Sequence, residues 1–313
     1  MSVATVPSTT FAEVLLASDF SEESGRALTY AKNIIRGSGG ELLLLHVAQL
    51  APVLALPEGM WVDDSVRIRA EEQETEEAAA ALRAEGLRVK ALCPFGSVGQ
   101  RVAQTAEIHH ADLVIIGTHG RRGLNRLIFG SYAEETAGSL ETPLLIVGPR
   151  APLAAQAVWK PCHILCSISF SPDDARLVAF AYLLATKYQA SFEVVWFTAD
   201  LKDRTDSPWV GLRESVRKLL DDEHTANELP LHIVPLPDPK AKSLTEAVIT
   251  RNADLVVIGG ASREWLTLHE GTLQELLADV PCPILTFPAR GSYEKQTAFE
   301  KVTPLTAPLE SLL

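Results

Sequence analysis

Three short segments from the first half of the chain recur, in the same order, in the second half. The matching pairs are residues 14–21 (VLLASDFS) with 164–171 (ILCSISFS), 111–117 (ADLVIIG) with 253–259 (ADLVVIG), and 142–145 (TPLL) with 282–285 (CPIL). The distance between the copies falls from 150 to 142 to 140 positions along the chain. Ordered repeats of this kind predict a tandem duplication whose second copy has slightly shorter loops.

Each copy alternates short apolar segments with segments whose apolar residues recur at helical spacing. This alternation predicts parallel strands joined by right-handed crossovers, and therefore an open α/β sheet with helices on both faces. In the first copy we expect strands at 14–18, 42–47, 87–91, 112–116 and 144–147, and helices at 21–37, 71–85, 98–110 and from 131. In the second copy we expect strands from 164 and 253 and at 192–197, 231–236 and 284–287, and helices at 172–188 and 212–225.

A chain of 313 residues is long enough for two such domains, each with its own core. We expect a first domain at 11–149 and a second domain at 161–288, joined by a linker at 150–160. Residues 1–10 are expected to form a loose leader, and residues 289–313 a tail with little periodicity.

Composition limits the partners of the chain. The formal net charge is −12, with no basic stripe to offset it, which disfavours nucleic acid or an anionic membrane as the main partner. No apolar run approaches the ~20 residues of a membrane helix, and the N-terminus does not resemble a signal peptide. The 4 cysteines lack the spacing of a zinc site, so no metal ligand is predicted. We therefore expect a cytoplasmic protein.

Residues 112–131 (DLVIIGTHGRRGLNRLIFGS) carry the features of an anion site. A buried strand stops at Gly117, Gly120 follows, and after nine intervening residues Gly130 and Ser131 open a helical pattern. Glycines let the backbone approach a ligand, and the unpaired N–H groups of a first helical turn attract phosphate. Arg122, in the intervening loop, has a side chain suited to phosphate oxygens. Each residue alone is equally typical of a turn, a helix cap or a solvated loop, so the full spacing is what indicates a site.

This spacing resembles the nucleotide-binding signature of the universal stress protein family, in its ATP-binding branch. The flanking segments IIGTHGRRGL, GSYAEE and TPLLIV fit the same family. The resemblance implies an adenine nucleotide alpha hydrolase-like fold with strand order 3-2-1-4-5. That order would reverse between the first and fourth strands, which end at Asp19 and Gly117, and ligands of open α/β sheets lie at such reversals.

The resemblance also implies roles for individual residues. Ala17 and Asp19 would flank the adenosine, Val47 would offer backbone groups to the adenine edge, and Ile116 and Gly117 would support the ribose. The phosphates of ATP, with or without Mg²⁺, would be held by loop and helix-start residues: Gly120, Arg122, Gly130, Ser131, Tyr132 and Ala133. Ala133 stands where family members often place a hydroxyl group. Two alternatives remain open, because Asp19 is also placed to cap the helix after Ser21, and Val47 is also typical of plain core.

The second copy departs from the signature. Ser169 replaces the carboxylate of Asp19, and acidic residues replace the arginine-rich lining of the loop. We therefore expect the second domain to be degenerate and without nucleotide. Its last strand would pair with the last strand of the first domain inside one chain, with a homodimer as the other assembly left open.

Three functions remain. The preferred one is an ATP-binding regulatory protein of the stress response, with no catalytic residue predicted. The alternatives are a slow ATP hydrolase that uses Asp19 and a metal ion, and a nucleotide-free interaction module built from the two halves.

Overall fold

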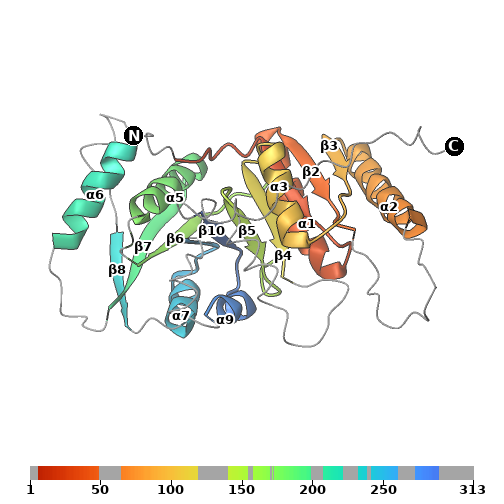
Figure 1. Cartoon of the computed structure of the whole chain (residues 1–313). Coiled ribbons are helices and arrows are strands. Elements are labelled where there is room, and N and C mark those ends of the chain that lie inside the picture. The colour runs from red at the N-terminus through yellow and green to blue at the C-terminus, as the bar shows by residue number, and fades with distance from the viewer. Residues whose placement is uncertain are drawn as a thin grey trace, which may run out of the picture.

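In a computed structural model of the chain, ten strands form one continuous sheet in the order β3-β2-β1-β4-β5-β10-β9-β6-β7-β8 (Figure 1). The structure describes residues 6–48, 65–118, 140–153, 158–169, 171, 173–198, 207–220, 232–237, 241–259 and 272–288. The strands of the first half are β1 (Glu13–Ala17), β2 (Glu41–Leu45), β3 (Val89–Leu92), β4 (Leu113–Gly117) and β5 (Leu144–Val147). Those of the second half are β6 (His163–Ile168), β7 (Ser191–Thr198), β8 (His232–Pro237), β9 (Leu255–Gly259) and β10 (Ile284–Phe287).

All pairings within each half are parallel, and both halves have the order 3-2-1-4-5. The expected fold class and strand order are thus confirmed. Where the halves meet, β5 and β10 pair antiparallel, with Ile146 opposite Ile284 and Leu145 opposite Leu285. The strands of one half therefore run opposite to those of the other, so that their carboxyl ends lie at opposite edges of the sheet.

The register of the strands reproduces the repeat in the sequence. Val14 pairs with Leu113 in the first half, and Ile164 pairs with Leu255 in the second. These pairs are related by the same distances, 150 and 142 positions, that separate the repeated segments.

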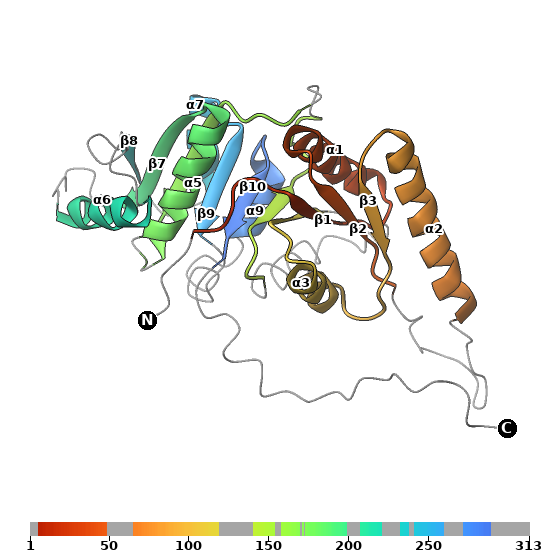
Figure 2. The ribbon, with the colours of Figure 1, turned by 90° about the horizontal axis from the view of Figure 1, so that it is seen from above.

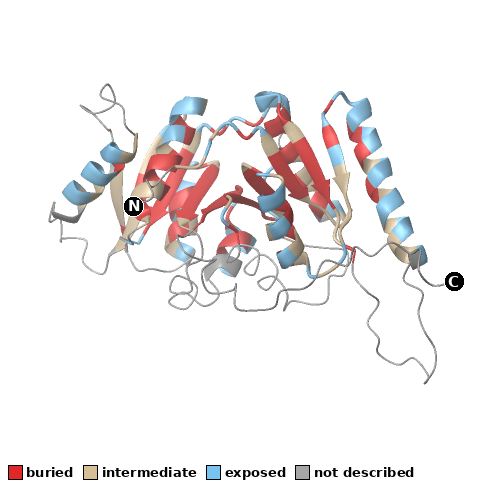
Figure 3. Cartoon of the chain, turned by 45° about the horizontal axis from the view of Figure 1, so that its top comes forward, coloured by how far each residue is buried: buried red, intermediate tan, exposed pale blue. Residues whose placement is uncertain are grey.

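Helices cover both faces of the sheet (Figure 2). One face carries α1 (Glu22–Ser38), α2 (Ser65–Ala84), α5 (Asp174–Tyr188) and α6 (Ser207–Leu220), whose buried residues form one core cluster. The other face carries α3 (Val98–Ile108), α7 (Ala241–Arg251) and α9 (Thr272–Asp279), which form a second cluster. Strand residues alternate between the two, as the two-residue period of a strand requires. The sheet is consequently buried and the outer helix faces are exposed (Figure 3).

Helix α1 begins as the sequence predicts and ends later. Ser21 is its N-cap, and the Ser21 side chain accepts a hydrogen bond from the backbone N–H of Ser24. The predicted end at Gly37 is wrong, because the helix continues to Ser38 and closes on Gly39. Gly39 has φ = 69°, a left-handed conformation that glycine adopts without strain, whereas Gly37 is still helical.

Segments outside the sheet connect the two halves. Tyr30 of α1 donates a hydrogen bond to the carbonyl of Pro152 at 2.9 Å, in the segment that joins the halves. Before β1, the carbonyl of Thr9 accepts a hydrogen bond from Lys187 of α5, and Phe11 is fully buried. The residues just before β1 therefore contact the second half at Thr9.

The repeated Ala-Asp-Leu-Val sequence has a structural cause. Asp112, just before β4, accepts hydrogen bonds from the backbone N–H groups of Ala12 and Glu13 at 2.8 and 3.0 Å. Asp254 does the same for Cys162 and His163, also at 2.8 and 3.0 Å. Each carboxylate thus fixes the start of the central strand of its half.

Candidate functional site

The crevice suggested by the strand order lies at the carboxyl end of β1. This strand has β2 on one side and β4 on the other, and its last residue, Ala17, is in register with both Leu45 and Ile116. The segment after β1 leads to α1 on one face, and the segment after β2 begins at His46. The strand order reverses between β1 and β4, and such a reversal is the usual position of a ligand in an open α/β sheet.

Three of the predicted site residues lie at this end of the sheet, and we call them the floor of the crevice. Ala17 ends β1, Ile116 is the second-last residue of β4 and Val47 lies two residues beyond β2, and all three pack against the core cluster on the α3 face. Each is only partly buried, although the preceding strand residues Leu16, Leu45 and Ile115 are fully buried. The structure thus brings together an apolar surface, partly open, at the point where the sheet order reverses.

Asp19 lies beside this floor, in the segment between β1 and α1. One oxygen of its carboxylate, Oδ1, accepts hydrogen bonds from the backbone N–H and the hydroxyl of Ser21, at 3.1 and 2.7 Å. Asp19 therefore holds Ser21, which is itself the N-cap of α1. Because Asp19 remains partly exposed, a contact with ligand is compatible with that role.

Sequence reasoning missed His46, which borders the crevice. Its Nδ1 lies 2.9 Å from the carbonyl oxygen of Ser18, and its ring stacks on Phe20 at a centroid distance of 5.1 Å. Because the Ser18 carbonyl can only accept, Nδ1 carries the proton and holds the backbone between Ala17 and Asp19. A polar residue directly after a buried run of leucines was the signal that could have identified it.

Gly117 ends β4 opposite Val147 of β5, on the far side of the crevice from β2. The chain from 119 to 139 is outside the described residues. The predicted phosphate-binding residues all lie there: Gly120, Arg122, Gly130, Ser131, Tyr132 and Ala133. Their roles stay predictions.

The equivalent crevice of the second half has a different floor. Ser167 and Ile258, which correspond to Ala17 and Ile116, are 6% and 1% exposed. The positions that are partly open in the first half are therefore covered in the second.

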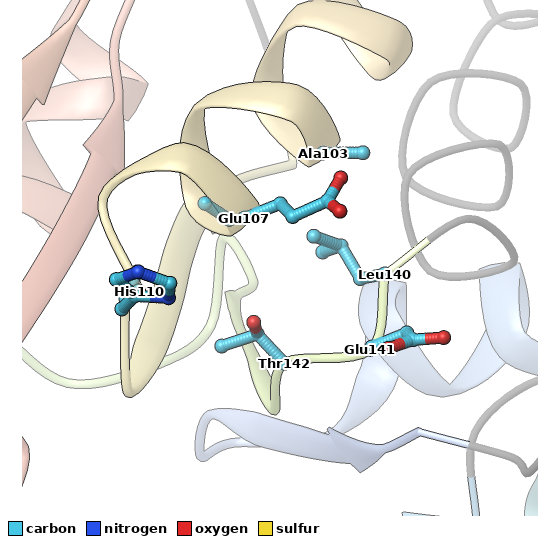
Figure 4. Close-up of a pocket in the computed structure, with 8 residues that line it drawn as sticks. Ala103, Glu107, His110, Leu140, Glu141 and Thr142 are labelled. Atoms are coloured by element: carbon cyan, nitrogen blue, oxygen red, sulfur yellow. The ribbon is translucent and has the colours of Figure 1, made fainter.

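A separate hollow of about 280 Å³ lies at the other end of the strands (Figure 4). It is bounded by the end of α3, with Glu107 and His110, and by the segment before β5, with Leu140 and Glu141. This position, at the amino ends of β4 and β5, separates it from the crevice.

Two kinds of feature are absent from the described part of the chain. No group of three or more His, Cys, Asp or Glu side chains in that part is placed to hold a metal ion. Within the same residues, no helix is both long and apolar enough to cross a membrane.

Comparison with known proteins identifies relatives of the first half. A model of the universal stress protein family matches residues 10–148. A universal stress protein of Methanocaldococcus jannaschii is 29% identical over 139 residues, which cover 44% of this chain and 82% of the relative. A universal stress protein of Mycolicibacterium smegmatis is 34% identical over 147 residues, covering 44% of this chain and 46% of the relative.

The likeness among solved structures extends over both halves. The crystal structure of a universal stress protein from Archaeoglobus fulgidus has a TM-score of 0.65 and 18% identity, and covers 88% of this chain and 96% of that chain. At this identity the likeness shows a shared fold. Residues 10–148 thus match the universal stress protein family, and the chain as a whole shares the fold of a solved structure from that family.

Proposed function

We propose that the first half of the chain binds ATP in the crevice at the end of β1, and that the protein acts as a nucleotide-dependent regulator. The observation that carries this proposal is the partly open apolar floor of Ala17, Val47 and Ile116. An adenine ring is flat and largely apolar, and such a surface between polar groups is typical of ligand sites.

The polar groups around the floor fit the rest of a nucleotide. Asp19, two residues beyond Ala17, would accept a hydrogen bond from the ribose hydroxyls. Gly117 opens the segment whose sequence carries the phosphate-binding pattern, and Arg122, Gly130 and Ser131 supply cationic and N–H groups suited to phosphate. Mg²⁺ would accompany the phosphates. Gly120, Tyr132 and Ala133 complete the proposed contacts through their backbone.

In this proposal the nucleotide-binding domain spans residues 11–149, and the domain at 161–288 serves as its permanent partner. The pairing of β5 with β10 supports such an arrangement, because it buries the last strand of each half against the other. Regulation then requires that the ligand bind two conformations or assemblies with different affinity.

Two identical substitutions test the location of the site. Ala17→Glu places a carboxylate on the crevice floor, and we expect it to weaken ATP binding about ten-fold or more by blocking apolar contact and repelling phosphate. Ala103→Glu makes the same change at the edge of the hollow in Figure 4 and is expected to leave ATP binding unchanged. Isothermal titration calorimetry with ATP, AMP and GTP measures both variants against wild type.

The outcomes separate the alternatives. Loss of binding only in Ala103→Glu would move the site to the hollow and refute the proposal. Absence of binding in wild type, together with no nucleotide released on denaturing the freshly purified protein, would favour a nucleotide-free interaction module. Phosphate release from ATP, lost in Asp19→Ala, would instead identify a slow hydrolase.

A further inference from the structure

The segments β1–α1 and β6–α5 are equivalent, yet each carries its carboxylate at a different position. Glu13 and His163 are bound in the same way by Asp112 and Asp254, so residues of the second segment are numbered 150 higher than those of the first. Position 19 is Asp19 in the first half and Ser169 in the second. Position 24 is Ser24 in the first half and Asp174 in the second.

The two carboxylates bind equivalent groups of their segments. Asp19 accepts from the N–H and the hydroxyl of Ser21, and Asp174 accepts from the N–H and the hydroxyl of Ser171, at 2.8 and 2.9 Å. Asp174 additionally accepts from the N–H of Ser169, at 3.0 Å. The second half has therefore moved the carboxylate five residues along the chain while keeping its role in holding the segment together.

The exposure of the two carboxylates differs. Asp19 precedes its helix and is partly exposed at the crevice, whereas Asp174 belongs to α5 and is 3% exposed. Three donors within the protein bind the Asp174 carboxylate, and a buried charge satisfied in this way is held firmly.

We propose that the position of this carboxylate determines which half binds nucleotide. At position 19 it stabilises the segment and faces the crevice. At position 174 it stabilises the segment from inside the protein, and no carboxylate is left to meet a ribose. The burial of Ser167 and Ile258 supports this inference independently, because it closes the floor of the same crevice. The inference rests on the proposed function, since it assumes that the open crevice takes a nucleotide.

The chain offers its own design for a test. Asp19→Ser removes both roles and is expected to lower the melting temperature by about 2–4 °C and ATP affinity about ten-fold. The double variant Asp19→Ser/Ser24→Asp copies the second half into the first. It is expected to recover the melting temperature of wild type while ATP affinity stays about ten-fold reduced. The reverse exchange, Ser169→Asp/Asp174→Ser, is the matched control: it alters only the second half, whose floor stays closed by Ser167 and Ile258, and should leave the ATP affinity of the first half unchanged.

Calorimetry with ATP and thermal unfolding followed by circular dichroism give the two measurements. Recovery of ATP affinity in the double variant would overturn the inference, because position 24 would then serve the ligand equally well. Failure of Ser24→Asp to restore the melting temperature would also overturn it, because the two positions would not be interchangeable. A wild-type chain that binds no ATP refutes the proposed function instead, and that result is seen before any variant is compared.

Discussion

Removal of the Asp112 side chain tests how the central strand of the first half is anchored. In Asp112→Ala, the backbone N–H groups of Ala12 and Glu13 lose acceptors at 2.8 and 3.0 Å. A hydrogen bond to a charged group contributes about 1.5–3 kcal/mol, with the lower value for the exposed bond to Ala12. The pKa of Glu13 is raised mainly by burial, next by the charge of Glu41 and then by that of Asp112. Removal of Asp112 therefore relieves a small repulsion. The two bonds together contribute about 3–4.5 kcal/mol, and relief of the repulsion leaves an expected net loss in the free energy of unfolding of about 3–4 kcal/mol.

Urea unfolding followed by tryptophan fluorescence and circular dichroism measures this loss, and agreement of the two probes checks that the sheet unfolds as one unit. Asp112→Asn keeps one oxygen acceptor without the charge, and should lose about half as much. Asp254→Ala removes the equivalent pair of bonds in the second half and should match Asp112→Ala, with nearly additive effects in the double variant. A loss below about 0.5 kcal/mol in Asp112→Ala would refute the anchoring role.

Three further predictions concern the contacts between the halves and the buried phenols. Gly148→Ala would place a Cβ 2.6 Å from the carbonyl oxygen of Leu277, so we expect a loss of about 1–3 kcal/mol in thermal unfolding. Tyr30→Phe removes the hydrogen bond to Pro152 and should cost about 1 kcal/mol by urea unfolding. Burial raises the pKa of Tyr30 and of Tyr188 to about 12, whereas both ionise near 10 when unfolded. The neutral phenols therefore stabilise the folded state fully below about pH 10, and this contribution is lost between about pH 10 and 12. Absorbance at 295 nm follows the ionisation, and unfolding at each pH measures the lost stability.

The sheet could be predicted well from the sequence because its strands are short apolar runs, buried on both faces. Segments such as LVIIG and LVVIG leave no polar face, which is typical of parallel strands under two layers of helices. Because the same segments recur, the strands of the second half could be predicted from those of the first.

Helix boundaries were less predictable, because several signals compete at each helix end. Gly37 and Gly39 are both suited to end α1, and only the left-handed backbone conformation of Gly39 shows which of them does so. Helix α6 begins at Ser207, five residues before the predicted start, although Pro208 is well suited to a first helical turn. Helix α7 was not predicted, although Leu244, Ala247 and Val248 have the spacing of one buried helical face.

The candidate site was predictable where a family signature or a strand end marked it. Ala17 ends β1, and Ile116 and Gly117 are the last two residues of β4, so the topology alone brings them together. The role of Asp174 could not be predicted, because a side chain of helix α5 there takes the place that Asp19, between β1 and α1, has in the first half. Comparison of the two repeats in the sequence shows only that Ser169 stands in place of Asp19.

The antiparallel contact between β5 and β10 has a consequence for how the protein can change over time. In an assembly of two identical chains, every substitution at such a contact appears twice and must suit its own copy. Here Ile146 lies opposite Ile284, and each of the two can be substituted without changing the other. Because one polypeptide carries both strands, dilution does not separate them. The two halves can therefore diverge in sequence from each other while the pairing of β5 with β10 is kept.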